Sequence, residues 1–255
     1  MNAKLQTVPH ERLHKVLART GIGSRRQVEA WIKSGRIQIN GKVAAVGDRI
    51  ADSDSVTLDG RPVGFTTALP VRTRVLAYHK PGGELTTRHD PKGRRTVFDT
   101  LPGISKGKWI AIGRLDLNTA GLLLFTNNGE LANHLMHPSA QVEREYAVRV
   151  LGRVSDSAIR NMLKGVVLED GRARFRELTD AGGTGANHWY RVIIQEGRNR
   201  EVRRLWESQG IKVSRLIRVR FGSYTLPRGK SQGQFWELDR RAIDALREVA
   251  GIKKV

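Results

Sequence analysis

The stretch GRLDLNTAGLLLFTNNGELANHLMHP, residues 113–138, joins a polar turn to an apolar run. Asp116 stands between Arg114 and the turn at 118–121, and the apolar residues 122–125 follow directly. A single acid next to an arginine and an apolar wall is a candidate nucleophile. Asp, Asn, Thr and Gly are also common turn residues, so a purely structural role for Asp116 is the alternative.

Hydrophobic periodicity on both sides of this stretch predicts many strands and a few helices. The expected strands lie at 75–79, 109–112, 122–126, 146–150, 173–178, 189–195, 214–221 and 235–238, and the expected helices at 131–136, 156–163, 200–208 and 241–249. No regular βαβ alternation connects them. The pattern therefore favours the α+β class, with a largely antiparallel, mixed sheet flanked by helices.

Residues 10–60 have the pattern of a separate small unit. Apolar residues at helical spacing predict a first helix that ends near Gly21. Ser24 and Gln27 then form a capping box, which predicts the start of a second helix. Alternating residues around Asn40-Gly41 predict a β-hairpin.

The remaining boundaries follow from composition. Residues 61–72 carry two prolines and a glycine without a clear period, which is typical of a linker. A larger domain is expected over residues 73–251.

Net charge limits the class of partner. The chain has 45 Lys and Arg against 25 Asp and Glu, a net charge of +20, which favours polyanions and above all nucleic acid. It has no cysteine, which excludes disulfides and thiolate metal sites. No apolar run approaches the ~20 residues of a membrane span. The N-terminal stretch lacks an apolar signal region, so we expect a cytoplasmic protein without membrane contact.

Three cations of the small unit are candidate RNA contacts. Arg25 and Arg26 lie in the first turn of the expected second helix, where the helix dipole disfavours positive charge. A solvated surface pair is the alternative, but the overall charge favours phosphate as the compensating partner. Lys42, on the expected hairpin, joins them as a candidate.

Tyr146 is a candidate for a buried site. In EREYAVRV, Tyr146, Val148 and Val150 share one face of the expected strand, so the tyrosine points inward. A core tyrosine with a satisfied hydroxyl is the common alternative.

The segment QEGRNREVRRLWESQG places several arginines on one predicted helix. Val202, Leu205 and Trp206 form its expected core stripe, whereas Arg200, Arg203, Arg204 and Glu207 share another face. Like charges at this spacing repel one another. A solvated face is the alternative; an anionic partner or a buried acid explains the stacking better.

Several other chemistries lack their motifs. The glycines of 103–108 are too close for a P-loop, and Trp109 stands where Ser or Thr would bind magnesium. His134 and His137 have no clustered third ligand for a metal. There is no GxSxG elbow. We expect neither a metal nor a cofactor.

Three motifs in order, GRLDLNTAGLLLFTNNGELANHLMHP, VEREYAV and EGRNREVRRLW, resemble one group of ribosomal pseudouridine synthases. The group consists of small-subunit synthase A together with large-subunit synthases B, E and F. The resemblance covers nearly the whole chain and is strongest to the synthase B branch, which acts on 23S ribosomal RNA. The first 60 residues, with SRRQVEAWIKSGRIQINGK, resemble the S-four-like RNA-binding module.

The resemblance implies a role for each candidate. Asp116 corresponds to the catalytic aspartate, Tyr146 to the tyrosine that stacks on the target base and transfers a proton at the sugar, and Arg203 to the basic residue that pairs with the aspartate. The apolar run 122–125 is expected to help form a dry pocket. Arg114, Thr119, Arg200 and Arg204 are candidate RNA contacts.

The implied reaction isomerises a uridine, extruded from its helix, to pseudouridine. Two routes stay open for the aspartate: attack on C1′, or removal of the C2′ proton to give a glycal-like species. The expected partner is ribosomal RNA, free or in assembling large-subunit particles, and the expected state is a monomer. Alternatives are a non-enzymatic RNA-binding or ribosome-assembly protein, a nuclease, or a synthase of the same group acting at another ribosomal RNA site.

Overall fold

The computed structural model describes residues 10–67, 72–104, 107–183 and 185–252. The chain divides into two compact units, one of residues 1–73 with 103–109 and one of residues 74–102 with 110–255. Part of the expected linker, 68–71, and part of the P-loop-like stretch, 105–106, lie outside the described residues.

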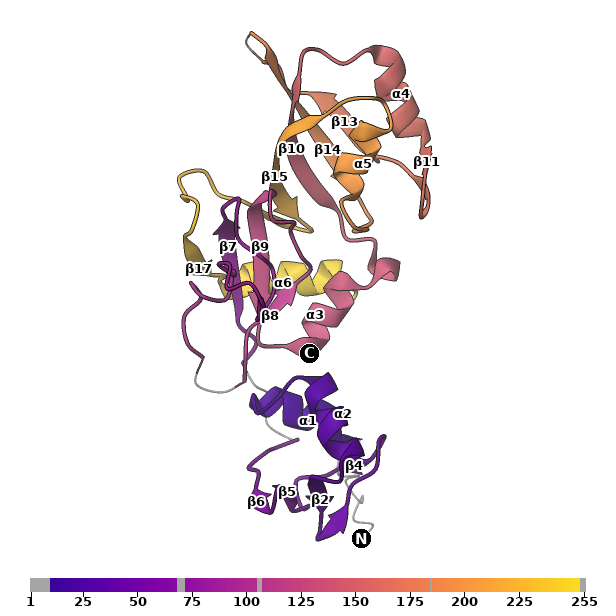
Figure 1. Cartoon of the computed structure of the whole chain (residues 1–255). Helices are drawn as coiled ribbons and strands as arrows, with labels where there is room; N and C mark the ends of the chain where they lie inside the picture. Colours follow the sequence, from indigo (N-terminus) through magenta and orange to yellow (C-terminus); the bar gives the residue numbers. More distant parts are fainter. Residues whose placement is uncertain (1–9, 68–71, 105–106, 184, 253–255) are drawn as a thin grey trace, which may run out of the picture. The chain divides into compact units, whose positions relative to one another are not determined.

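The N-terminal unit contains two helices and short strands, drawn in indigo in Figure 1. The capping box predicted at Ser24 and Gln27 is confirmed, as is the turn at Asn40-Gly41, where both residues have positive φ. The helices are α1 (Leu13–Thr20) and α2 (Arg25–Lys33). The strands are β1 (Glu11–Arg12), β2 (Ile37–Ile39), β3 (Lys42–Val43), β4 (Arg49–Ile50), β5 (Val56–Leu58) and β6 (Arg61–Pro62), with β1 paired to β4 and a sheet of order β3-β2-β5-β6.

The larger unit is built on one mixed sheet of order β13-β14-β10-β15-β9-β7-β17, with β8 added to β9 and β16 to β15. Its pairs are antiparallel except β15 with β9, which confirms the α+β prediction. These strands are β7 (Val75–Lys80), β8 (Ile110–Ile112), β9 (Ala120–Thr126), β10 (Arg144–Leu151), β13 (Glu177–Asp180), β14 (Asn187–Ile194), β15 (Val213–Phe221), β16 (Tyr224–Thr225) and β17 (Phe235–Glu237). A separate hairpin pairs β11 (Val166–Leu168) with β12 (Gly171–Ala173).

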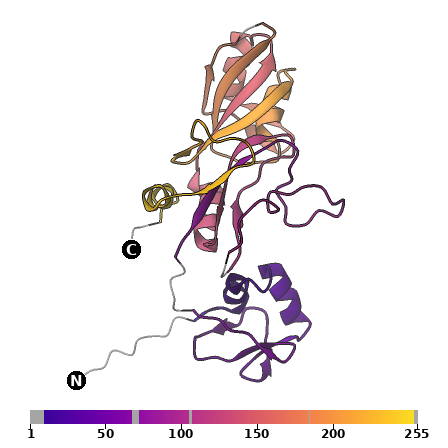
Figure 2. The same cartoon turned by 90° about the vertical axis from the view of Figure 1, so that its left-hand side faces the viewer.

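Helices flank both halves of this sheet, as Figures 1 and 2 show. Helices α3 and α6 contact each other, and α3 packs beside β8 and β9; α4 contacts β13, and α5 contacts β15 and the hairpin strand β11. The helices are α3 (Gly129–Met136), α4 (Asp156–Lys164), α5 (Glu201–Glu207) and α6 (Arg240–Val249), with a short 3₁₀ helix η1 (Pro138–Ala140). One core cluster joins β7, β9, α3 and α6 through Ala77, Leu124, Leu135 and Leu246.

The expected strand at 173–178 is wrong in one respect: it is two strands, β12 and β13, separated by residues 174–176. Ala173 and Phe175 are both buried, and their alternation imitates one continuous strand. Ala173 pairs within the hairpin, whereas the chain from Arg176 onward bonds to β14, so the partner changes between them.

The two halves of the sheet meet where β15 runs parallel to β9, at the pairs Ile217–Ala120 and Arg218–Gly121. Gly121 has a φ of 110°, and a Cβ at this position would collide with the backbone of Arg218. Only glycine permits this approach. The turn that carries Asp116 ends directly at this junction.

Candidate active site

The loop between β8 and β9 is fixed through its backbone. Each carbonyl from Leu115 to Thr119 accepts a hydrogen bond: from the Thr86 hydroxyl at 2.9 Å for Leu115, and from the Thr119 amide at 3.0 Å for Asp116. Gly83 donates to Leu117 at 2.8 Å. The turn interpretation of Asp116 is therefore correct for its backbone, and it leaves the side chain free for another role.

Lys80, at the end of β7, is fully buried and holds the same loop. Its Nζ donates to the carbonyls of Pro81 at 2.8 Å, Thr119 at 2.9 Å and Leu117 at 3.4 Å. Burial lowers the pKa of Lys80 to about 8, against the opposing attraction of Glu84 and Asp116. Lys80 was not predicted from the sequence, because a lysine at the end of a strand resembles a surface residue.

Arg203 reaches the loop from α5, but the expected ion pair with Asp116 is not formed. Its guanidinium donates to the carbonyls of Asn118 at 2.9 Å and Val213 at 3.0 Å. These two acceptors take both terminal nitrogens, so the contact with the Asp116 loop is through its backbone. Burial and the nearby Arg200 lower the pKa of Arg203, while the charge of Asp116 opposes this shift.

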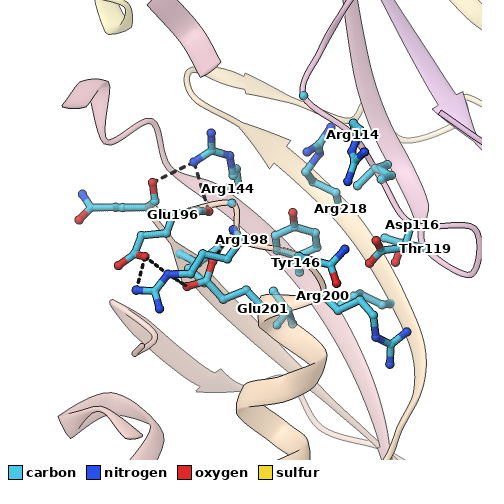
Figure 3. Close-up of a pocket in the computed structure, with 18 of the residues that line it drawn as sticks. Arg114, Asp116, Thr119, Arg144, Tyr146, Glu196, Arg198, Arg200, Glu201 and Arg218 are labelled. Atoms are coloured by element: carbon cyan, nitrogen blue, oxygen red, sulfur yellow. Dashed lines mark hydrogen bonds and ion pairs between the residues drawn. The ribbon is translucent and has the colours of Figure 1, made fainter. Parts of the chain in front are cut away.

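The Asp116 carboxylate lines a pocket of about 870 Å³ and accepts no hydrogen bond from any residue that the structure describes. Tyr146 lines the same pocket from β10; it is 8% exposed, which confirms the inward orientation predicted from the strand pattern. Figure 3 shows Asp116, Thr119, Tyr146, Arg114 and Arg218 gathered on one side of the pocket. An acid, an aromatic ring and cations thus converge on one cavity.

The apolar lining differs from the expectation. Residues 122–125 are fully buried in β9 and do not line the pocket. Its apolar lining comes instead from Leu115, Met136, Pro138, Ile194, Val202 and Leu216. The run faces both sides of the sheet core, because β9 is a central strand covered on each face.

The arginines of α5 do not share one solvated face. Arg200 has a φ of 48° at the cap of the helix and pairs with Glu207 at 3.2 Å. Arg203 is only 8% exposed, and Arg204 forms a bidentate pair with Asp170 at 2.8 and 2.9 Å. The predicted core stripe of Val202, Leu205 and Trp206 is confirmed.

The predicted RNA contacts fall into separate places. Arg114, Thr119 and Arg200 line the pocket, whereas Arg204 does not. Arg25, Arg26 and Lys42 lie on the N-terminal unit with exposed side chains that have no hydrogen bond or ion pair to any described residue.

Arg218 lines the pocket and, like Lys80, was not predicted from the sequence. It is 2% exposed, its Nε donates to the Leu122 carbonyl at 2.7 Å, and its Nη2 has no partner among the described residues. The sequence did contain a signal for Arg218: it follows Leu216 on the inward face of a strand. Burying a charged side chain there is costly unless it is hydrogen-bonded or paired, so its presence indicates a specific role.

Within the part of the chain that the structure describes, no cluster of three or more His, Cys, Asp or Glu is arranged to hold a metal ion. None of the described helices is long and apolar enough to cross a membrane.

Comparison with protein families connects this geometry to an activity. A model described as RNA pseudouridylate synthase matches residues 74–208, which include Asp116, Tyr146 and Arg203. The chain belongs to the RNA pseudouridylate synthase family. An S4 domain model matches residues 11–63 of the same synthase.

Curated relatives extend the match over the rest of the synthase. It is 57% identical to the ribosomal large subunit pseudouridine synthase B of Vibrio cholerae over 95% of this chain and 76% of that protein. Identity to the proteins of the same name is 55% in Pseudomonas aeruginosa, over 96% of this chain and 64% of that protein, and 54% in Escherichia coli O157:H7, over 94% and 83%. A solved pseudouridylate synthase has the same fold, with a TM-score of 0.64 at 23% identity over 92% of this chain and 99% of the other.

Proposed function

We propose that this synthase isomerises a uridine of large-subunit ribosomal RNA, 23S RNA, to pseudouridine, with Asp116 as its catalytic carboxylate. The observation that carries the proposal is the Asp116 side chain: it stands in a pocket without a hydrogen bond from any described residue, on a loop whose carbonyls are all held. Because this loop already holds the carboxylate in position, little reorganisation is needed when the substrate binds. The names of the relatives support the choice of RNA.

The reaction breaks the C1′–N1 bond, turns the uracil and joins C5 to C1′. C5 gives up its proton and N1 gains one, so atoms and electrons balance without an oxidant or reductant. Asp116 begins the reaction either by attacking C1′ or by taking the C2′ proton. Tyr146 stacks against the base and takes part in proton transfer at the sugar.

Arg203 and Lys80 act on Asp116 through the loop backbone. The guanidinium fixes the Asn118 carbonyl and the ammonium fixes the Thr119 carbonyl, so the carboxylate keeps its position when the uridine enters. A misplacement of about 1 Å costs on the order of 100-fold in rate, so holding the carboxylate in place contributes directly to the catalytic rate.

The two units divide the work in this proposal. The N-terminal unit, residues 10–60, binds the RNA; residues 61–72 link it to the catalytic domain, residues 73–251, which extrudes and isomerises the uridine. Extrusion costs a few kcal/mol, which contacts to the surrounding RNA offset. The proposed place of action is the bacterial cytoplasm, where ribosomal RNA is made; action as a monomer stays a prediction.

The test compares the wild-type chain with Asp116→Asn on unmodified 23S RNA transcripts. We expect the wild type to form pseudouridine and Asp116→Asn to bind the RNA with unchanged affinity but form none, because the amide lacks both the nucleophile and the base. Pseudouridine is detected by chemical mapping. RNA binding without any pseudouridine formed by the wild type would instead favour the non-enzymatic binding protein.

A further inference from the structure

The arginines that line the pocket differ in whether they have a hydrogen-bond acceptor. Seven arginines of the described part of the chain line it. Most have an acceptor: Arg144 donates to the carbonyls of Val142 and Gln195, Arg176 pairs with Glu143, Arg198 with Glu196, Arg200 with Glu207, and Arg218 donates to the Leu122 carbonyl. Arg114 and Arg174 make no hydrogen bond or ion pair with any described residue. These two pocket guanidiniums have neither a carboxylate nor a carbonyl acceptor among the described residues.

The backbone on either side of Arg174 holds this side chain outward. Its neighbours Ala173 and Phe175 are 2% and 1% exposed, so alternation directs Arg174 away from the core. The Phe175 amide donates to the Met162 carbonyl at 3.0 Å, and the Arg176 amide donates to the Ile193 carbonyl at 2.8 Å. The guanidinium is therefore presented from a fixed segment.

Arg114 is presented in a comparable way on the Asp116 side. The next residue, Leu115, is 5% exposed, and both its amide and its carbonyl bond to the Thr86 hydroxyl. Arg114 itself is exposed and lies two positions before Asp116.

A guanidinium without an acid partner, at the mouth of a pocket in a chain of net charge +20, is suited to an anionic group. Uracil is neutral, so the anion that accompanies an extruded uridine is the phosphate of the RNA backbone. Arg174 precedes β13 and Arg114 precedes β9, which are four strand positions apart in the sheet, roughly 19 Å at about 4.8 Å per strand. Strands β14, β10 and β15 lie between them and carry the pocket residues Ile194, Tyr146 and Arg218, so the two arginines flank the part of the pocket that holds Tyr146.

We propose that the RNA backbone crosses the pocket mouth between Arg114 and Arg174, and that these arginines bind phosphates on opposite sides of the extruded uridine. The inference rests on the proposed function, and it names the RNA contacts of that site. The arginines that are already paired with carboxylates contribute less, because an acid beside the guanidinium repels phosphate.

The test measures RNA affinity at several salt concentrations for Arg114→Gln, Arg174→Gln and a control, Arg241→Gln. Arg241 is exposed and unpaired among the described residues, but it lies on α6, outside the pocket lining. The probe is a large-subunit ribosomal RNA fragment that the wild-type enzyme converts to pseudouridine.

We expect Arg114→Gln and Arg174→Gln each to weaken binding about tenfold. Each also lowers the slope of log affinity against log salt by roughly 0.7–0.9, the value for one lost phosphate contact. Arg241→Gln keeps the wild-type affinity and slope. Arg174→Lys, which retains the charge, recovers most of the affinity.

Wild-type affinity and slope in Arg114→Gln or Arg174→Gln would overturn the inference, as would a loss in Arg174→Lys equal to that in Arg174→Gln. Neither result affects the proposed function as long as the wild type forms pseudouridine. Failure of the wild type to convert any ribosomal RNA fragment would refute the proposed function itself.

Discussion

The two units use the same kind of side chain in opposite ways. In the catalytic unit, Lys80, Arg203 and Arg218 are at most 8% exposed and donate to backbone carbonyls. In the N-terminal unit, Arg25 and Arg26 are exposed and have no partner among the described residues. The net charge alone therefore does not measure RNA affinity, because some cations of this chain are buried and donate hydrogen bonds to its own backbone carbonyls.

The difference has an energetic basis. A buried cation is desolvated and must find acceptors inside the protein, so its removal leaves carbonyls without donors. An exposed cation has lost no hydration, and it contributes only when a phosphate displaces counterions. Substitutions of the two kinds should therefore affect different measurements, catalysis and stability in one unit and RNA affinity in the other.

Among the substitutions of cations, the largest loss of activity is expected from Lys80→Met. The side chain is similar in length, but the carbonyls of Leu117 and Thr119 lose their ammonium donor and the loop that carries Asp116 loosens. We expect the single-turnover rate at saturating RNA to fall by about 100-fold. Lys92→Met, at an exposed lysine whose ammonium has no described partner, is the matched control. A Lys80→Met rate within a few-fold of wild type would contradict the positioning role.

An intermediate effect is expected from the double variant Arg25→Gln/Arg26→Gln. Loss of two phosphate contacts should lower RNA affinity and reduce the salt slope by roughly 1.5, while the thermal unfolding temperature stays unchanged. Filter binding and calorimetry measure the two quantities. An unchanged slope would show that these arginines are a solvated surface pair. The exposed cations of the N-terminal unit would then not be RNA contacts, and the proposed contrast between the units would be wrong.

The last prediction concerns the pH dependence of stability. Burial lowers the pKa of Lys80 to about 8 from an ordinary 10.5, so between these values the unfolded chain binds more protons than the folded one. The cost of burying the charge, fully present below pH 8, should therefore disappear as the pH rises toward 10.5. Denaturant unfolding of wild type and Lys80→Met tests this: the free-energy difference should shift in favour of the wild type over that range. A constant difference would contradict it.

Much of the fold is visible in the sequence because local signals agree with the final structure. The capping box at Ser24, the Asn40-Gly41 turn and the apolar run at 122–125 each specify a local element. The prediction of one strand at 173–178 was wrong, because alternation within one segment does not indicate a change of partner strand. Pairing depends on segments distant in sequence, which periodicity cannot identify.

The site was predictable in part for a similar reason. The motif around Asp116 and the inward face of Tyr146 are local, whereas the acceptors of Arg203 and Arg204 are not. Asp170, which pairs with Arg204, precedes it by 34 residues and lies on another element, so a helical projection does not show it. Lys80 depends on carbonyls, which no side-chain pattern reveals.

The parallel junction of β9 and β15 has a consequence for the nascent chain. Asp116 is synthesised about 100 residues before Arg203 and Arg218, whose contacts complete its surroundings. At roughly 5–20 residues per second, that interval is on the order of 5–20 s of translation. During that interval the acidic loop exists without its final supports, so the surroundings of Asp116 are completed only after Arg218 has been synthesised.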